Sequence, residues 1–176
     1  MRRAASPSGF TIIEILIVMA LIGVVSSLAV IGVGHARVRA AETAALASLH
    51  TINQAQFAYM QACGNQAYAP TLVSLGTPPP GSDSAFLSPD LTQSDPLQKS
   101  GYVIQLGGTL KTDEVPTCNG VVPLEKYYAT ADPANPGHSG IRSFGTNSDR
   151  VIYGDVATFS GNMPESGAPG HGVEIR

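Results

Sequence analysis

Residues 10–34 read FTIIEILIVMALIGVVSSLAVIGVG and contain one ionisable side chain, that of Glu14. From Ile15 to Gly34 the stretch is uncharged. As an α-helix rising about 1.5 Å per residue, this stretch would reach roughly 30 Å, the thickness of a bilayer's hydrocarbon core. We therefore expect a helix that can span a membrane, and the carboxylate near its start needs an explanation.

Two ordinary explanations of this segment differ in how well they fit. A secretory signal peptide would explain the short N-terminal segment 1–9, which carries Arg2 and Arg3 ahead of the apolar block. However, the apolar block is longer than the roughly 7 to 15 residues of a signal core, and no A-x-A-like cleavage site follows it. A simple single-pass anchor stays open, because Arg37 and Arg39 on the far side balance the first two arginines and the charges set no orientation.

Glu14 separates the remaining explanations. An acidic side chain costs up to about 3 kcal/mol near the centre of a membrane helix and less near an end. It could simply lie in the first helical turn, where the helix dipole favours a negative charge. Alternatively, cleavage between Gly9 and Phe10 would create an ammonium group four residues before the carboxylate, and this ammonium would compensate its charge.

The string GFTIIEILIVMALIGVVSSLAV, residues 9–30, resembles the N-terminal signature of type IV pilins and of the pseudopilins of type II secretion systems. The resemblance implies that residues 1–9 are a leader removed by a prepilin peptidase, which cuts after Gly9. It also implies that Phe10 becomes the methylated terminus and that Glu14 is the glutamate that acts in assembly. Residues 10–34 would then be a transmembrane half-helix that later lies in a filament core.

The resemblance further implies a structural subunit of a type IV pilus, with a type II secretion pseudopilin as the alternative. The expected partners are the prepilin peptidase, copies of the chain or related pilins, an inner-membrane assembly platform, and membrane lipid before assembly. The chain would cross the inner membrane once, with its C-terminal domain outside the cytoplasm, and then join an extracellular pilus or a periplasmic pseudopilus. In a dry helix bundle, Glu14 paired with a Phe10 ammonium would set register.

Beyond Gly34 the pattern becomes amphipathic, which predicts a second half-helix over residues 35–63. It should continue to about Ala62, where Cys63, Gly64 and Asn65 supply a stop. The inward stripe comprises Val38, Ala45, Leu49, Ile52, Gln56 and Tyr59, with Leu46 and Met60 beside it. Polar side chains expected mostly on other faces are Arg39, Glu42, Thr43, His50, Asn53 and Gln54.

Residues 64–176 are expected to form one globular domain. Within it, 64–100 reads as a connecting loop with a short helical turn near residues 71–75. Residues 101–159 hold an antiparallel sheet of about four strands, and 160–176 form a C-terminal loop or a partly mobile tail. The fold class is therefore α+β, pilin-like: a long N-terminal helix packed on a small sheet. The four strand-like pieces cover 102–106, 126–131, 141–144 and 151–159.

The sequence has two cysteines, Cys63 and Cys118. A domain exported through a membrane meets an oxidising space, which favours a disulfide between them. Closing a loop of that length would contribute about 4 kcal/mol in the chain-entropy model. This disulfide would tie the end of the helix to the middle of the domain.

Little in the sequence indicates chemistry. No catalytic motif or metal-ligand spacing is visible around His35, His50, His138 or His171, which predicts no enzyme and no cofactor. Asp149 and Asp155 in TNSDRVIYGD are weak candidates for calcium ligands, because the oxygen ligands are sparse. The net charge of −3 indicates no nucleic-acid partner. Two further alternatives are a membrane-anchored exported binding protein and an exported enzyme.

Overall fold

The computed structural model describes residues 9–112 and 117–175, and for residues 28–33 it describes the backbone only. The predicted leader, residues 1–9, lies outside the described residues apart from Gly9. The chain divides into two compact units, residues 1–37 and residues 38–176.

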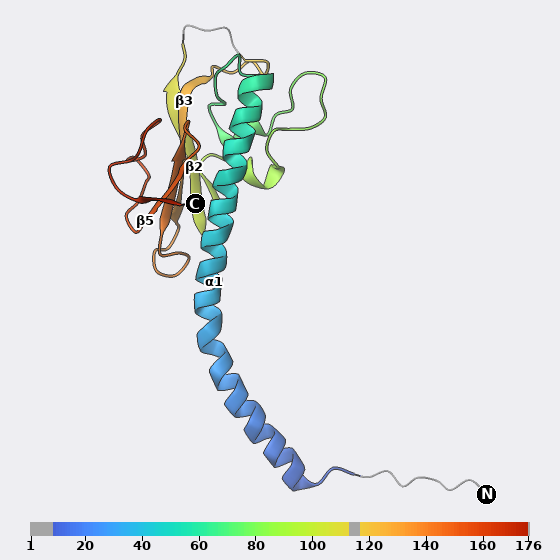
Figure 1. The fold of residues 1–176 in the computed structure, drawn as a ribbon. Coiled ribbons are helices and arrows are strands. Elements are labelled where there is room, and N and C mark those ends of the chain that lie inside the picture. The colour runs from blue at the N-terminus through green and yellow to red at the C-terminus, as the bar shows by residue number, and fades with distance from the viewer. Residues whose placement is uncertain (1–8, 113–116, 176) are drawn as a thin grey trace, which may run out of the picture. The chain divides into compact units, whose positions relative to one another are not determined.

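Helix α1 spans Ile12–Ala62 and belongs to both units (Figure 1). Its end at Ala62 confirms the predicted stop. There, the backbone N–H groups of Cys63 and Gly64 both donate to the Tyr59 carbonyl, at 2.9 and 2.8 Å. Asn65 and Gln66 then adopt positive φ angles of 48° and 67°, which turn the chain away from the helical path.

In the second unit, α1 buries the stripe predicted from the sequence. The most deeply buried members recur at steps of three and four residues. They are Ala45, Leu49, Ile52, Gln56 and Tyr59. The assignment of Asn53 to an outward face was wrong, because its side chain is 5% exposed and makes hydrogen bonds in the core.

The sheet has six strands rather than about four, in the order β1-β2-β3-β4-β5-β6 with every neighbouring pair antiparallel. The second half of α1 lies alongside this sheet in Figure 1. The face of the sheet toward α1 carries Tyr102, Ile104, Tyr127, Ala129 and Phe144, all almost fully buried. The strands are β1 Leu97–Lys99, β2 Tyr102–Leu110, β3 Leu124–Pro133, β4 Ser143–Asn147, β5 Ile152–Asp155 and β6 Val173–Ile175.

The four predicted strands correspond to β2 through β5, and the two edge strands were missed. Each edge strand has three residues, too few to show an alternating pattern. β1 joins β2 through Ser100 and Gly101, whose φ angles of 50° and 82° match a primed two-residue hairpin. The strand predicted over 151–159 is shorter in the structure: β5 ends at Asp155, where the chain leaves the sheet.

The connecting segment 64–100 contains the predicted helical turn. Helix α2 spans Leu72–Leu75, and the Thr71 hydroxyl caps it by accepting the Ser74 N–H at 3.1 Å. The segment also contains a 3₁₀ turn, η1, over Pro89–Leu91. The Asp95 carboxylate holds α2 to the sheet by accepting the backbone N–H groups of Leu72 and Leu106, at 2.9 and 3.1 Å.

The prediction of a C-terminal loop or mobile tail over 160–176 was incomplete. Phe159 and Met163 are buried, and a Cβ on Gly145 in β4 would lie 3.0 and 2.8 Å from them. Asp132 accepts the backbone N–H groups of Phe159 and Ser160 at 3.0 and 3.2 Å. Residues 156–172 therefore pack as a strap on the sheet before the chain enters β6. The sequence did not predict this packing, because the small and polar residues of the segment show no periodic pattern of apolar side chains.

Candidate processing and assembly site

The predicted cleavage bond lies in an open stretch just before α1. Gly9, Phe10 and Thr11 precede the first helical residue, Ile12. Phe10 is 76% exposed, and a Cβ built on Gly9 would meet no atom within 4 Å among the described residues. A peptide bond with this exposure is sterically open to a peptidase.

Glu14 lies in the first turn of α1 and forms a reciprocal cap with Thr11. Its Oε2 accepts hydrogen bonds from the Thr11 backbone N–H at 3.4 Å and from the Thr11 hydroxyl at 3.3 Å. In return, the Glu14 N–H donates to the Thr11 hydroxyl at 3.3 Å. This is a capping box, in which residues three apart satisfy each other's helix-terminal groups. The spacing T-x-x-E at residues 11–14 could have revealed it in the sequence.

The carboxylate is only partly used by this cap. Both hydrogen bonds involve Oε2, and within the described part of the chain Oε1 accepts none. Glu14 is exposed, so the cap orders the group without enclosing it. The site therefore presents an oriented carboxylate oxygen near the start of the helix.

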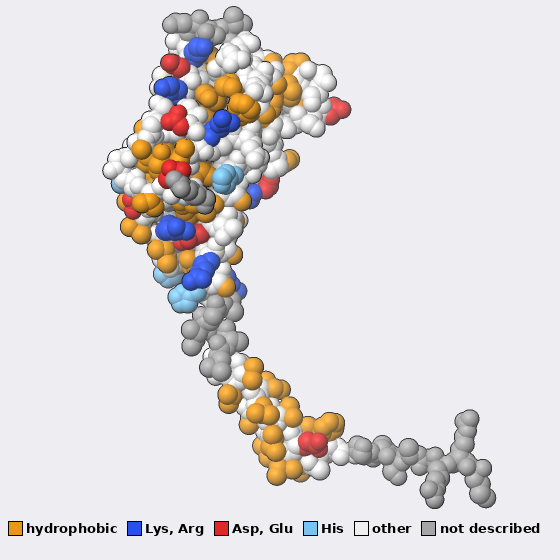
Figure 2. Space-filling model, in the orientation of Figure 1, with side chains coloured by type: hydrophobic (Ala, Val, Ile, Leu, Met, Phe, Trp, Pro, Cys, Tyr) orange, Lys and Arg blue, Asp and Glu red, His pale blue; other side chains and the backbone are white. Residues whose placement is uncertain are grey.

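The neighbours of Glu14 along the helix are apolar and exposed, among them Ile13 and Ile15. Figure 2 shows hydrophobic side chains covering the lower part of the helix in the view. No side of the helix is polar over this stretch. Among residues whose side chains are described, which excludes 28–33, no helix is both long and apolar enough to cross a membrane. The exposed large side chains are Phe10, Ile12, Ile13, Ile15, Leu16, Ile17, Val18, Met19, Leu21, Ile22, Val24 and Val25.

The predicted disulfide between Cys63 and Cys118 is confirmed. The Cα atoms are 4.9 Å apart, and the Cys118 N–H donates to the Cys63 carbonyl at 3.0 Å. The bond fixes the end of α1 to the segment before β3. It contributes to the stability of the second unit by restricting its unfolded chain.

The two weak candidates for calcium ligands take part in loop contacts. Asp149 accepts the Gly167 N–H at 2.6 Å. Asp155 accepts the N–H group of Ala157, contacts the His171 ring at 3.0 Å and accepts the N–H group of Val156, and these contacts hold the pKa of its carboxyl below the usual value. Among the described residues, no group of three or more His, Cys, Asp or Glu side chains is arranged to hold a metal ion.

The four histidines do not converge on one site. His35, His50 and His138 are exposed. His171 is half-buried, where its ring stacks on Phe159 with centroids 4.8 Å apart. It therefore belongs to the contacts of the C-terminal strap.

Comparison with known proteins finds a match for the N-terminal segment. Residues 6–30 match the family model described as the prokaryotic N-terminal methylation motif. No curated protein and no solved structure matches the chain. The matched residues include Gly9, Phe10 and the capping pair Thr11 and Glu14. The chain therefore carries the N-terminal methylation motif of the type IV pilin and pseudopilin family.

Proposed function

We propose that the chain is a structural subunit of a type IV pilus. It is made as a membrane-inserted prepilin, cleaved after Gly9 by a prepilin peptidase, methylated at Phe10, and assembled into a helical filament through its N-terminal helix. The observation that carries the proposal is one oriented carboxylate, that of Glu14, among the exposed apolar side chains of residues 12–25 in α1. Before assembly, the helix lies in the inner membrane with residues 64–176 outside the cytoplasm.

The physics of the N-terminal helix supports assembly with copies of itself. A helix that is apolar on all sides is stable in lipid or buried among similar helices. Moving it from lipid into a filament core, with the help of an inner-membrane platform, exchanges one apolar environment for another. An uncompensated carboxylate in that core would be costly, so Glu14 needs a cation there.

Cleavage after Gly9 would supply that cation. The new ammonium at Phe10 would adjoin Thr11, whose N–H and hydroxyl already hold Oε2 of Glu14. Oε1 would be left for the ammonium of a neighbouring subunit. Both charges occupy fixed positions on the helix. Only one axial register of neighbouring subunits would therefore bring them together, and other registers would leave a charge unpaired.

The first experiment tests processing. Intact-mass analysis of the protein from its native membrane should give the mass of residues 10–176 plus one methyl group. A start at Met1, or at a site beyond Gly34, would contradict the proposal.

The second experiment separates the charge of Glu14 from its capping role. Glu14→Gln removes the charge but keeps a side chain able to cap the helix, and Thr11→Ala removes the cap but keeps the charge. Each variant is co-expressed with wild type, and its share in sheared filaments is divided by its share in the membrane. We expect Glu14→Gln to be strongly depleted, as Glu14→Ala should be, and Thr11→Ala to enter nearly as well as wild type. Equal incorporation of Glu14→Gln would leave Glu14 with a capping role only.

The same motif occurs in pseudopilins, so a type II secretion pseudopilus is the alternative assembly. Sheared surface filaments in which this chain is the most abundant protein support a pilus. Its recovery only from the periplasm and inner membrane supports the pseudopilus.

A further inference from the structure

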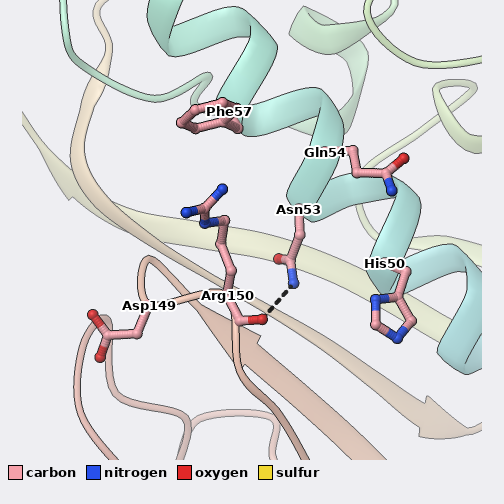
Figure 3. Close-up of a pocket in the computed structure, with 6 residues that line it drawn as sticks. All are labelled: His50, Asn53, Gln54, Phe57, Asp149 and Arg150. Carbon is pink, nitrogen blue, oxygen red and sulfur yellow. Dashed lines mark hydrogen bonds between the residues drawn. The ribbon is translucent and has the colours of Figure 1, made fainter. Parts of the chain in front are cut away.

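An open pocket of about 380 Å³ lies between the second half of α1 and the turn that joins β4 to β5 (Figure 3). Helix α1 supplies four of the lining residues. They lie on one face of the helix, because they follow one another at steps of three, one and three positions. The turn supplies the opposite wall. The lining residues are His50, Asn53, Gln54 and Phe57 from the helix and Asp149 and Arg150 from the turn.

Arg150 is held firmly at the wall of this pocket. Its φ of 63° lies in the left-handed region that non-glycine residues rarely adopt. Two hydrogen bonds fix its backbone: its N–H donates to the Asn147 carbonyl at 2.8 Å, and its carbonyl accepts the Asn53 amide at 3.4 Å. The turn therefore holds the Arg150 backbone in a fixed position on the wall of the pocket.

The guanidinium of Arg150 is oriented, but it has no anionic partner among the residues that the structure describes. Its central carbon lies 4.6 Å from the ring centroid of Phe57, a partly exposed aromatic side chain. No carboxylate among the described residues is within ion-pair distance of it. The neighbouring Asp149 carboxylate accepts the Gly167 N–H instead, and Figure 3 shows it pointing away from the guanidinium. A stacked, planar guanidinium with free donors suits a carboxylate.

A carboxylate of the right kind occurs elsewhere on the second unit. Asp83 is exposed in the segment between α2 and η1, and its side chain makes no hydrogen bond or ion pair with any described residue. Pro78, Pro79 and Pro80 precede it and restrict the backbone. In Figure 1 this green segment extends on one side of α1, and strand β5 lies on the other side.

We propose that the pocket docks the Asp83 carboxylate of a second copy of this chain, with Arg150 as the bidentate donor and Phe57 as the surface beneath it. Each copy carries the acid on one side of α1 and the guanidinium in a pocket on another. Because the segment that carries Asp83 and strand β5 lie on opposite sides of α1 in Figure 1, one copy would use its acid and its pocket against two different neighbours. The contact would then be head-to-tail and would continue from copy to copy, as a helical filament requires. The inference rests on the proposed function and assigns a contact between its globular domains.

Charge reversal tests the pair. Arg150→Glu and Asp83→Arg should each lower the share of the variant in filaments about fivefold or more when co-expressed with wild type. The double variant, expressed as the sole copy, should recover filament yield relative to either single variant expressed alone. Glu125→Lys is the matched control, because Glu125 is also an exposed acid with no ion pair to a described residue. Unchanged incorporation of both single variants would overturn the inference.

Cysteine cross-linking tests the geometry without altering the charges. Gln54→Cys and Ser84→Cys are combined in one chain, where both native cysteines are already bonded to each other. Oxidised filaments should give a ladder of multimers on a non-reducing gel, because each copy contacts two others. Filaments that give only monomers, or only dimers, would overturn the inference and leave the proposed function standing. Absence of the wild-type chain from all filaments would instead contradict the proposed function itself.

Discussion

The first and second parts of helix α1 differ in where their apolar side chains go. In the first unit, Ile12 is 84% exposed and apolar side chains cover the helix on every side. In the second unit, Leu49 and Ile52 are completely buried against the chain's own sheet. The second part satisfies its apolar surface within one molecule, whereas the first leaves it for lipid or for other molecules.

The polar groups of the two parts differ in the same way. Glu14 makes only local hydrogen bonds, with Thr11, three residues away. Asn53 makes long-range ones, with Tyr127 and Thr146, across the helix–sheet interface. Substitutions in the second unit should therefore change folding stability. Those in the first should change assembly and leave the fold of the second unit intact.

The largest expected effect on stability comes from the disulfide. Replacing Cys63 and Cys118 by serine should lower the free energy of unfolding of the second unit by about 4 kcal/mol, given their sequence separation of 55. Thermal unfolding of the full chain in detergent, followed by circular dichroism, measures this loss. A loss below about 1 kcal/mol would show that contacts other than the bond restrict this loop.

The next effect concerns the buried amide of Asn53. Asn53→Ala leaves the Tyr127 hydroxyl without its 2.8 Å acceptor and the Thr146 hydroxyl without its 2.9 Å donor. Burial raises the pKa of the Tyr127 phenol, so the hydroxyl remains a neutral donor. We expect a loss of about 2–3 kcal/mol.

The neighbouring exposed residue gives the control for this substitution. Gln54→Ala should change the free energy of unfolding by less than about 0.5 kcal/mol. Equal losses for the two variants in chemical denaturation would contradict the inward assignment of Asn53.

These residues also show what the sequence could and could not predict. The uniform apolarity of the first part of α1, the offset between Gly9 and Glu14, and the stripe from Ala45 to Tyr59 are local or periodic features. The long helix and the motif were therefore predictable from the sequence. Asn53 was not, because a polar side chain is buried only when distant partners such as Thr146 reach it. A short strand such as β6 depends on its neighbour in the sheet rather than on its own three residues.

A smaller effect is expected where the C-terminal strap packs on the sheet. A Cβ on Gly145 would lie 2.8 Å from the Met163 sulfur and 3.0 Å from Phe159 Cγ. Gly145→Ala should therefore destabilise the second unit by about 1–2 kcal/mol through overpacking. Gly170→Ala is the control, because its Cβ would meet no atom within 4 Å. The unfolding midpoint in urea should be lower for Gly145→Ala than for Gly170→Ala. Identical midpoints would show that the strap shifts to accommodate the added methyl group without loss of stability.

The smallest expected effect is a dependence of stability on pH through Asp95. Burial raises the pKa of this carboxyl above its ordinary value, although the N–H groups of Leu72 and Leu106 oppose the shift. The folded chain therefore holds this proton more tightly than the unfolded chain. Its stabilising contribution is full below the unfolded pKa and is lost as pH rises through the folded pKa.

Asp95→Asn removes that titration while keeping one acceptor oxygen. The free energy of unfolding of wild type minus that of Asp95→Asn should therefore decrease as the pH is raised from about 3 to about 6. Asp90 and Asp155, whose carboxyl pKa values are lowered, act in the opposite direction but are present in both proteins, so the subtraction cancels them. Denaturant titrations at several pH values measure the difference. A difference that grows with pH would mean that the two backbone N–H groups outweigh burial at Asp95, and that this carboxylate stabilises the second unit in its charged form.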